Sequence, residues 1–306
     1  MALTEISNTR LVRQKIEAPE IKTVKDIVSW MGAIQAQDYP MAKWAIGVRM
    51  SDPSEKRIES SLDKGEILHI HVLRPTWHFI SSDDIYWMLH LSAQKIKSSL
   101  RSRHKELELT ESVITKTSGI IEKSLSNGLS LTHDESLAAL AKKYFLSRCP
   151  ATLEDFVWWS NLSITDARKA IDFVRSDFFP ETIGSSTYWL PYSFPTAGSG
   201  TNSVHLLPAF DEFLISYKDR NISLSLIHNK KTVTDNGIFH PPVVVNGHVA
   251  GLWKRTIQKN KVIVEMNSFQ SFNKSARSLI DSKVHLFGQF LNKETELIIQ
   301  NSIILV

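Results

Sequence analysis

The chain has very little cysteine: Cys149 is the only one among 306 residues. A single cysteine excludes a disulfide within the chain, which fits a protein of a reducing compartment. The sequence also lacks a metal-type cysteine cluster, a glycine-rich phosphate loop, and a serine or cysteine in an elbow motif. These absences disfavour nucleotide hydrolysis and hydrolysis through a serine or cysteine nucleophile.

Targeting segments are missing as well. The first residues, Met1 to Glu5, lack the basic and apolar regions of a signal peptide. No apolar run approaches the roughly 18 residues that a transmembrane helix needs. We therefore expect a cytoplasmic protein that does not contact a membrane.

Charge of one sign is in slight excess, with 36 basic and 32 acidic side chains and a net charge of +4. Such an excess permits nucleic-acid binding without requiring it. Basic side chains gather between Lys95 and Lys105, a run with no acidic residue before Glu106. Hydrophobic residues make up 42% of the chain, which is enough for real cores. A chain of this length favours two or three small domains.

Short helices followed by a hairpin are predicted in the first third of the chain. Apolar residues at helical spacing indicate several short helices between residues 7 and 64. Two strands, 67–73 and 76–80, are predicted to turn at Arg74. This order is the plan of a winged helix-turn-helix domain, which we place at residues 1–108.

A second region of similar plan is predicted at residues 109–200. Its helix over 164–174 carries Arg168 and Lys169 and occupies the position of a recognition helix. A hairpin is expected to follow, turning near Gly184. The Pro-, Gly-, Ser- and Thr-rich segment 192–202 is the best candidate for a linker.

The third region is predicted at residues 201–306. Asn246 and Gly247 stand between two apolar strands, which is a strong signal for a hairpin. A long helix with apolar residues on one face is predicted over 275–291. The fold class expected for the whole chain is α+β and mainly helical.

Gln35 and Gln37 flank a small apolar residue. In an extended segment, side chains two residues apart face the same way, so both amides can converge on one ligand or water. An amide oxygen accepts a hydrogen bond and the NH2 group donates two, but an amide is a poor proton acceptor. On the residues alone, a structural role for the pair is the simpler interpretation.

Two other polar groups have competing interpretations. His69, His71 and His78 lie on the first predicted hairpin, where three imidazoles would suit zinc. No fourth ligand is evident, so we favour a DNA-facing or partly buried hairpin and expect no metal. Asp211 and Glu212 are adjacent, and adjacent helix residues do not face each other. We interpret them as a helix cap or as solvated surface.

Five blocks of sequence are distinctive as a set. In chain order they are Gly32–Asp38 with Trp44 and Arg49, Arg74-x-Thr76-x-His78, Pro150–Trp159 with Asp166–Arg168, Leu206–Leu214 with Tyr217–Arg220, and Val245–Gly251 with Trp253–Arg255. Together they resemble the AlkZ-like winged-helix family and span nearly the whole chain. One departure is Pro75, where the family usually has glycine.

The resemblance implies three tandem winged-helix domains in a C-shaped arrangement that cradles duplex DNA. It also implies a monofunctional glycosylase that excises alkylated purines, including bulky or crosslinked adducts. The family's catalytic motif is Gln, an apolar residue, then Gln or Asp, and Gln35-Ala36-Gln37 has the Gln form. We expect a monomer that needs no cofactor and binds double-stranded DNA carrying alkylated purines.

The implied chemistry suits amides. Alkylation at purine N7 makes the base cationic, so it leaves readily and the remaining task is to position water at the anomeric carbon. We hypothesise that Gln35 and Gln37 hold that water, whereas Lys43 is the local candidate amine for a lyase. DNA contacts are expected from Lys43, Arg49, Arg74, Thr76, Trp77, His78, Arg168, Lys169, Trp253, Lys254 and Arg255.

The alternative function is a non-catalytic winged-helix DNA-binding protein, such as a transcriptional regulator. It would use the same basic helix and hairpins. It predicts sequence preference, no base release, and typically symmetric dimers on palindromic sites.

Overall fold

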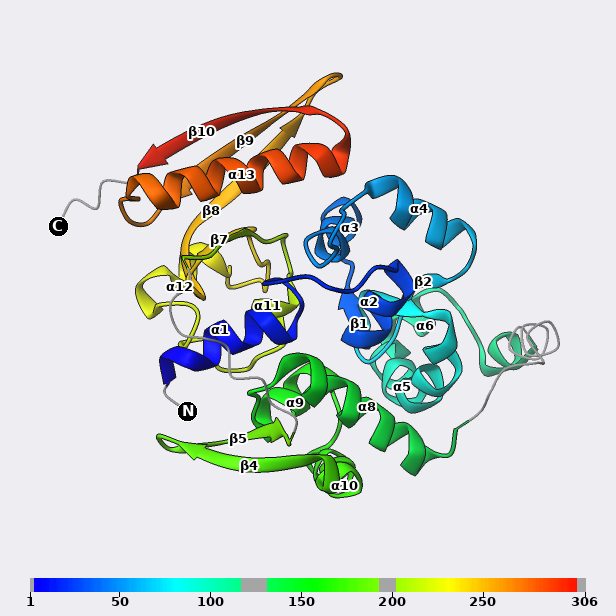
Figure 1. The fold of residues 1–306 in the computed structure, drawn as a ribbon. Helices are drawn as coiled ribbons and strands as arrows, with labels where there is room; N and C mark the ends of the chain where they lie inside the picture. Colours follow the sequence, from blue (N-terminus) through cyan, green and yellow to red (C-terminus); the bar gives the residue numbers. More distant parts are fainter. Residues whose placement is uncertain (1–2, 117–130, 193–201, 302–306) are drawn as a thin grey trace.

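A computed structural model describes residues 3–116, 131–192 and 202–301. These residues form an α+β fold with three separate sheets, one in each third of the chain (Figure 1). The predicted linker lies outside the described residues except for its two end residues. Of the helices that the structure describes, none has the length and apolar character to cross a membrane.

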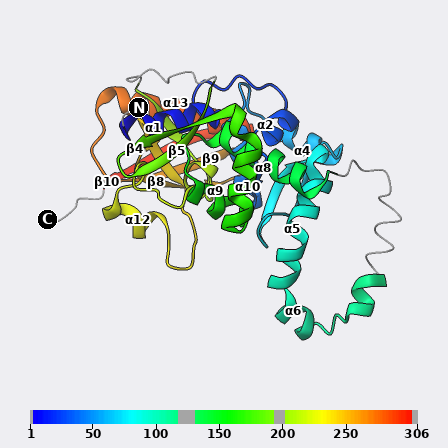
Figure 2. The same ribbon diagram turned by 90° about the horizontal axis from the view of Figure 1, so that it is seen from below.

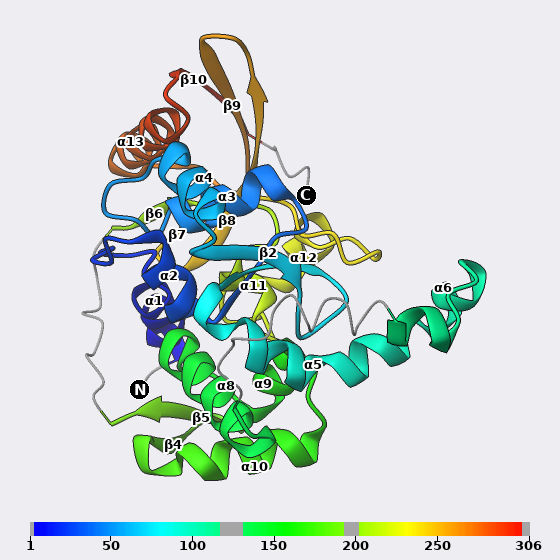
Figure 3. The same cartoon turned by 90° about the vertical axis from the view of Figure 1, so that its right-hand side faces the viewer.

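The first third contains short helices around a three-stranded sheet. Its elements are α1 (Leu3–Arg13), α2 (Val24–Met31), β1 (Ala33–Gln35), α3 (Tyr39–Gly47), α4 (Glu55–Asp63), β2 (Ile67–His71), β3 (Trp77–Ser81), α5 (Ile85–Ser99) and α6 (Arg101–Glu106). The predicted hairpin is confirmed as β2–β3, and β1 pairs with β3 on its other side. Thr23 caps α2, because its side chain accepts a hydrogen bond from the N–H of Asp26. Helices α5 and α6 project from the body as an arm (Figures 2 and 3).

The middle third places three helices before a hairpin. They are α8 (His133–Arg148), α9 (Leu153–Ser160) and α10 (Ile164–Val174), followed by β4 (Phe178–Ile183) and β5 (Ser186–Pro191). Thr152 forms a capping box with Asp155 at the start of α9, and Ser163 caps α10. The predicted hairpin is confirmed, and Gly184 at its turn has a φ of 63°, a conformation that glycine adopts without strain.

The last third is built on a five-stranded sheet. Its elements are β6 (Val204–Leu206), α11 (Glu212–Ile215), α12 (Leu226–Thr232), β7 (Pro242–Val245), β8 (His248–Ile257), β9 (Lys261–Ser268), α13 (Lys274–Leu291) and β10 (Glu294–Asn301). The strand order is β10-β9-β8-β7-β6, and β10 runs parallel to β9. Asn246 and Gly247 both have positive φ, as a tight hairpin turn requires, which confirms the predicted β7–β8 hairpin.

The hydrophobic cores cross the boundaries of the three regions. One core joins α2 and α3 to the five-stranded sheet and α13. A second core joins the β2–β3 hairpin and α5 to α8, α9 and α10. The first region therefore packs against both others, and a division at 108/109 and 200/201 stays a prediction.

We expect Gly288→Ala to destabilise the protein by roughly 1–3 kcal/mol. A Cβ at this position of α13 would meet the Thr295 side chain and lie 2.8 Å from the Lys293 carbonyl oxygen. Helix propensity alone favours alanine over glycine by about 1 kcal/mol and would stabilise the variant. A loss of stability would therefore show that the close approach of β10 outweighs helix propensity. Urea unfolding measures it, with Ser282→Ala on the exposed face of α13 as the control. A stabilised Gly288→Ala variant would contradict this packing.

Candidate functional site

The Gln-x-Gln segment and the β2–β3 turn, found separately in the sequence, meet in the structure. The N–H of Ala36 donates to the carbonyl of Trp77 at 2.7 Å. Arg74 donates from Nη2 to Oε1 of Gln35 at 3.2 Å, and the N–H of Trp77 donates to Oε1 of Gln37 at 3.5 Å. One turn therefore supplies a hydrogen bond to each of the two amides.

The segment passes from the protein interior to its surface within three residues. Gln35 is 5% exposed and Ala36 is buried, whereas Gln37 is exposed. Asp38 follows and caps α3, because its Oδ1 accepts from the N–H of Met41 at 3.3 Å. The Asp38 carboxylate is thus the N-cap of α3. Of the two amides, that of Gln35 lies just inside the protein surface and that of Gln37 lies on it.

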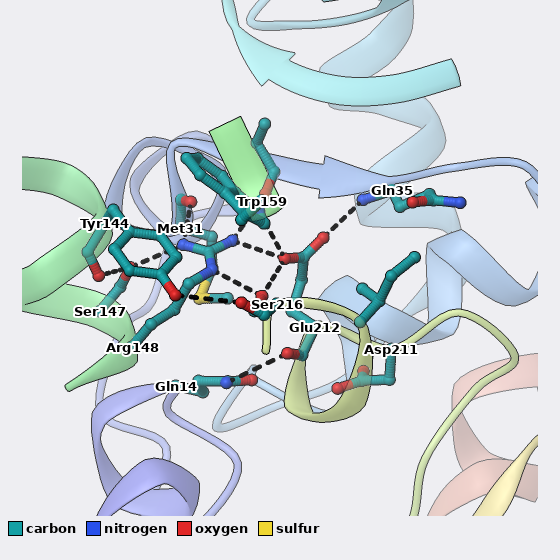
Figure 4. A network of polar contacts seen from close by, with 12 residues as sticks. Gln14, Met31, Gln35, Tyr144, Ser147, Arg148, Trp159, Asp211, Glu212 and Ser216 are labelled. Atoms are coloured by element: carbon teal, nitrogen blue, oxygen red, sulfur yellow. Dashed lines mark hydrogen bonds and ion pairs between the residues drawn. The ribbon is translucent and has the colours of Figure 1, made fainter. Parts of the chain in front are cut away.

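Glu212 lies behind Gln35 and is fully buried (Figure 4). Its Oε1 accepts from the backbone N–H of Gln35 at 2.9 Å. Its Oε2 accepts from Arg148 Nη2 at 2.8 Å, Trp159 Nε1 at 3.0 Å and Ser216 Oγ at 2.5 Å. Burial by itself raises the pKa of Glu212, but the charge of Arg148 and these hydrogen bonds outweigh it and hold the pKa at about 2.

The guanidinium group of Arg148 lies entirely inside the protein. It has no exposed surface, and its partners are Glu212, Ser216 Oγ at 2.8 Å, Ser147 Oγ at 2.8 Å, the Met31 carbonyl at 2.7 Å and the Ala33 carbonyl at 2.9 Å. The guanidinium also lies over the Trp159 ring, 4.3 Å from its centroid. The Glu212–Arg148 pair therefore links β1, α8, α9 and α11, which come from all three regions of the sequence.

A second buried ion pair lies beside the first. Arg49 donates two parallel hydrogen bonds to Asp211, both of 2.9 Å, and neither side chain is exposed. Gln14 accepts from Arg49 Nη2 at 3.0 Å and donates to the Glu212 carbonyl at 3.3 Å. This bidentate geometry is the strong form of an arginine–carboxylate contact.

The expectation for Asp211 and Glu212 needs correction. Asp211 does cap α11, accepting from the N–H of Phe213 at 2.9 Å, but both carboxylates are buried rather than solvated. Because adjacent helix residues diverge, each carboxylate faces its own arginine. Those arginines are 162 and 64 residues away in the chain, so local sequence carried no signal of the pairing.

Four of the expected DNA contacts are buried instead: Arg49, Trp253, His78 and Lys43. Arg49 is enclosed with Asp211, as described above. Trp253 is 3% exposed and donates from Nε1 to the Leu207 carbonyl at 2.7 Å. Both side chains hold the structure together and present no surface to a duplex.

Lys43, expected to contact DNA or act as an amine nucleophile, is also enclosed. It is 7% exposed and forms ion pairs with Glu55 and, at 2.9 Å, Glu59. Burial lowers the pKa of Lys43, but its hydrogen bonds to the two carboxylates outweigh burial and raise it overall. The amine therefore stays protonated, and a protonated amine is not a nucleophile.

The strand register does not bring together the three histidines that the zinc hypothesis requires. His71 lies opposite Trp77 and His69 opposite Phe79, so His78 faces the other side of the sheet. Among the residues that the structure describes, no group of three His, Cys, Asp or Glu side chains is placed to hold a metal. His69 instead stacks on Trp77, with ring centroids 4.5 Å apart.

The side chains of the β2–β3 turn differ in how far they reach solvent. His78 is buried, and burial together with the charge of Arg74 lowers its pKa to about 3, so the ring is neutral. Arg74 is mostly enclosed, and Thr76 Oγ1 is buried without a hydrogen-bond partner. Trp77 is 41% exposed and is the one member of this set with a large accessible surface.

The remaining predicted DNA contacts lie on the surface of two other elements. Arg168 and Lys169 are exposed on α10, where Lys169 pairs with Asp134 at 2.7 Å. Lys254 and Arg255 lie on β8, where Lys254 is exposed and Arg255 half-buried. These positions are accessible to a duplex, and their contacts with DNA stay a prediction.

Glu212→Gln should lower the free energy of unfolding by about 3–5 kcal/mol, because it leaves Arg148 buried without its countercharge. The folded-state pKa of about 2 lies below the ordinary value of 4.5. The ionised carboxylate therefore stabilises the fold above pH 4.5, and this contribution is lost as the pH falls toward 2. Chemical unfolding across this range should show the difference between wild type and variant shrinking. Glu154→Gln, at an exposed position of α9, is the control, and an equal effect there would contradict the assignment.

Comparisons with known proteins identify the family and a similar fold. A sequence model of the AlkZ-like DNA glycosylase family matches residues 28–121 and 97–290. The structure is similar to that of Streptomyces sahachiroi DNA glycosylase AlkZ, with a TM-score of 0.76 and 14% identity over 99% of this chain and 100% of that chain. No curated protein matches the sequence. The matched residues include the Gln-x-Gln segment, the β2–β3 turn and both buried ion pairs. Gln14, which contacts the ion pairs, lies before the matched residues. The chain belongs to the AlkZ-like DNA glycosylase family.

Proposed function

We propose that this protein is a monofunctional DNA glycosylase that excises N-alkylated purines, of the N7-alkylguanine type, from duplex DNA. Bulky or crosslinked adducts fall within the proposed substrate class. In the proposed reaction, water attacks the anomeric carbon while Gln35 and Gln37 position it. The observation that carries the proposal is the single turn, residues 74–77, that supplies a hydrogen bond to both amides at the edge of the solvent.

The ionisable groups around Gln35 favour this chemistry over general acid catalysis. His78 is neutral at physiological pH because its pKa is about 3, so it offers no acidic imidazolium proton. Glu212 is ionised, with a pKa of about 2, and its carboxylate is engaged with Arg148. A base that leaves as a cation needs no strong acid, so water positioned by amides is sufficient.

Arg74 is proposed to connect DNA binding to the catalytic amides. It is mostly buried, its Nε has no partner, and no acidic side chain in the described part of the chain forms an ion pair with it. Burying a cation is costly, and the charge of Glu212 offsets only part of that cost without forming an ion pair with Arg74. A DNA phosphate would supply a direct countercharge. A phosphate that draws Arg74 away would release Oε1 of Gln35 to accept from the attacking water.

The wider DNA surface is proposed from the exposed residues. Trp77 offers an accessible indole at the rim of the site, and aromatic faces of this kind stack on bases. Arg168 and Lys169 on α10 and the Lys254–Arg255 pair on β8 would contact phosphates or grooves. The three regions, 1–108, 109–200 and 201–306, would then act as tandem winged-helix domains around the duplex.

Gln35→Ala and Gln37→Ala should each reduce release of N7-methylguanine from methylated duplex DNA by about 10²-fold or more, because loss of positioning is that costly. Single-turnover assays at saturating enzyme separate this effect from binding. Gln289→Ala, which removes an exposed amide from α13, is the matched control and should be as active as the wild type.

Two outcomes would contradict parts of this proposal. Full activity in both glutamine variants would remove the site assignment. If the wild type binds duplex DNA but releases neither methylated nor bulky purines, the function is DNA binding without chemistry.

Lys43 should form no covalent intermediate with DNA. Incubation with an abasic-site duplex and borohydride is expected to trap no protein–DNA adduct, because Lys43 is paired with Glu55 and Glu59 and remains protonated. A bifunctional glycosylase on the same substrate serves as the positive control. An adduct that forms with the wild type and disappears in Lys43→Ala would replace the water mechanism with a lyase mechanism.

A further inference from the structure

The arm formed by α5 and α6 carries a stripe of basic side chains. Lys97, Arg101 and Lys105 are spaced four residues apart, which places them on one side of a helix. The junction at Leu100 keeps helical hydrogen bonds on both sides. Its N–H donates to the Ile96 carbonyl at 3.1 Å, and its carbonyl accepts from the N–H of His104 at 2.8 Å. We call Lys97, Arg101 and Lys105 the basic stripe.

The positive charges of the basic stripe are not neutralised by ion pairs within the described part of the chain. All three side chains are exposed, and none of them forms an ion pair there. Their neighbours are engaged differently: Arg103 pairs with Glu106 at 2.7 Å, and Lys95 donates to the Asn161 carbonyl.

Packing accounts for the base of the arm but not for its outer part, because α5 buries Trp87 and Met88 whereas α6 buries no residue. A helix that is polar on all sides gains little from burial, so it calls for another reason to project into solvent. Uncompensated positive charge on such a helix attracts an anionic partner.

The base of the arm adjoins the turn that holds Gln35 and Gln37. Ser92 on α5 accepts from the N–H of Leu73 at 2.9 Å, and Asn161 donates to the Leu73 carbonyl at 3.3 Å. The arm therefore starts beside residues 74–77. It extends on the side of the molecule where α12 lies, away from α13 (Figure 2).

We propose that the basic stripe is a phosphate-binding arm that contacts the backbone of duplex DNA flanking the lesion. At about 1.5 Å per residue, adjacent members of the stripe stand about 6 Å apart along the helix, roughly two phosphate rises of one strand. The distance from Ser92 to Lys105 is up to roughly 20 Å, or about six base-pair steps from the site. Contacts of this kind carry no sequence information, which suits an enzyme that must find a lesion in any sequence.

The arm proposal rests on the proposed function and is tested by binding rather than by base release. The variant is Lys97→Ala/Arg101→Ala, and the matched control is Lys274→Ala/Arg277→Ala, an exposed Lys–Arg pair on α13. Fluorescence anisotropy with a short undamaged duplex gives Kd over a series of salt concentrations. Each lost phosphate contact lowers the slope of log Kd against log salt by about 1.

The arm variant should lose about 2 from this slope and bind on the order of tenfold more weakly at low salt, with the control at wild-type values. Its thermal unfolding should match that of the wild type, because both side chains are exposed. An arm variant with the wild-type slope overturns the arm proposal and leaves the glycosylase proposal untouched. A reduced slope together with a wild type that releases no base supports the arm and defeats the glycosylase. A wild type that does not bind the duplex overturns both.

Discussion

The buried pair of Glu212 and Arg148 is the interaction on which the site depends. Two charges removed from water are costly unless every donor and acceptor is satisfied. Here Arg148 meets that condition partly with the carbonyl of Ala33, and Glu212 does so partly with the N–H of Gln35. The pair thus forms hydrogen bonds to the backbone at both ends of strand β1 and fixes the position of the Gln35 backbone. The same pair joins helices from the middle and the last third of the chain.

This arrangement also decides what chemistry remains available. Glu212 is engaged with Arg148 and ionised, and His78 is neutral, so neither of these two groups supplies an acidic proton near pH 7. The two amides can accept and donate hydrogen bonds, and that of Gln37 is exposed. A reaction whose leaving group is already cationic is compatible with such a site.

Much of the local structure could be predicted from the sequence, and the contacts of its charged residues could not. Helix α2, the β2–β3 and β7–β8 hairpins, and the caps at Thr152 and Ser163 follow from signals within a few residues of each other. Strand β1 is only three residues long, too short for a period to show, and β10 was not predicted although its residues alternate between exposed and half-buried. Arg49 was misassigned to the DNA surface because a charged side chain is usually exposed.

By itself, the sequence determined the α+β class, the hairpins and the Gln-x-Gln motif, because periodicity, capping and turn chemistry act over a few residues. Only the tertiary structure decided which charges are buried. Arg49 meets Asp211 across 162 residues and Arg148 meets Glu212 across 64, and no local pattern encodes such distances. It likewise placed the residue 74–77 turn against Gln35, because that contact depends on how β1 enters the sheet.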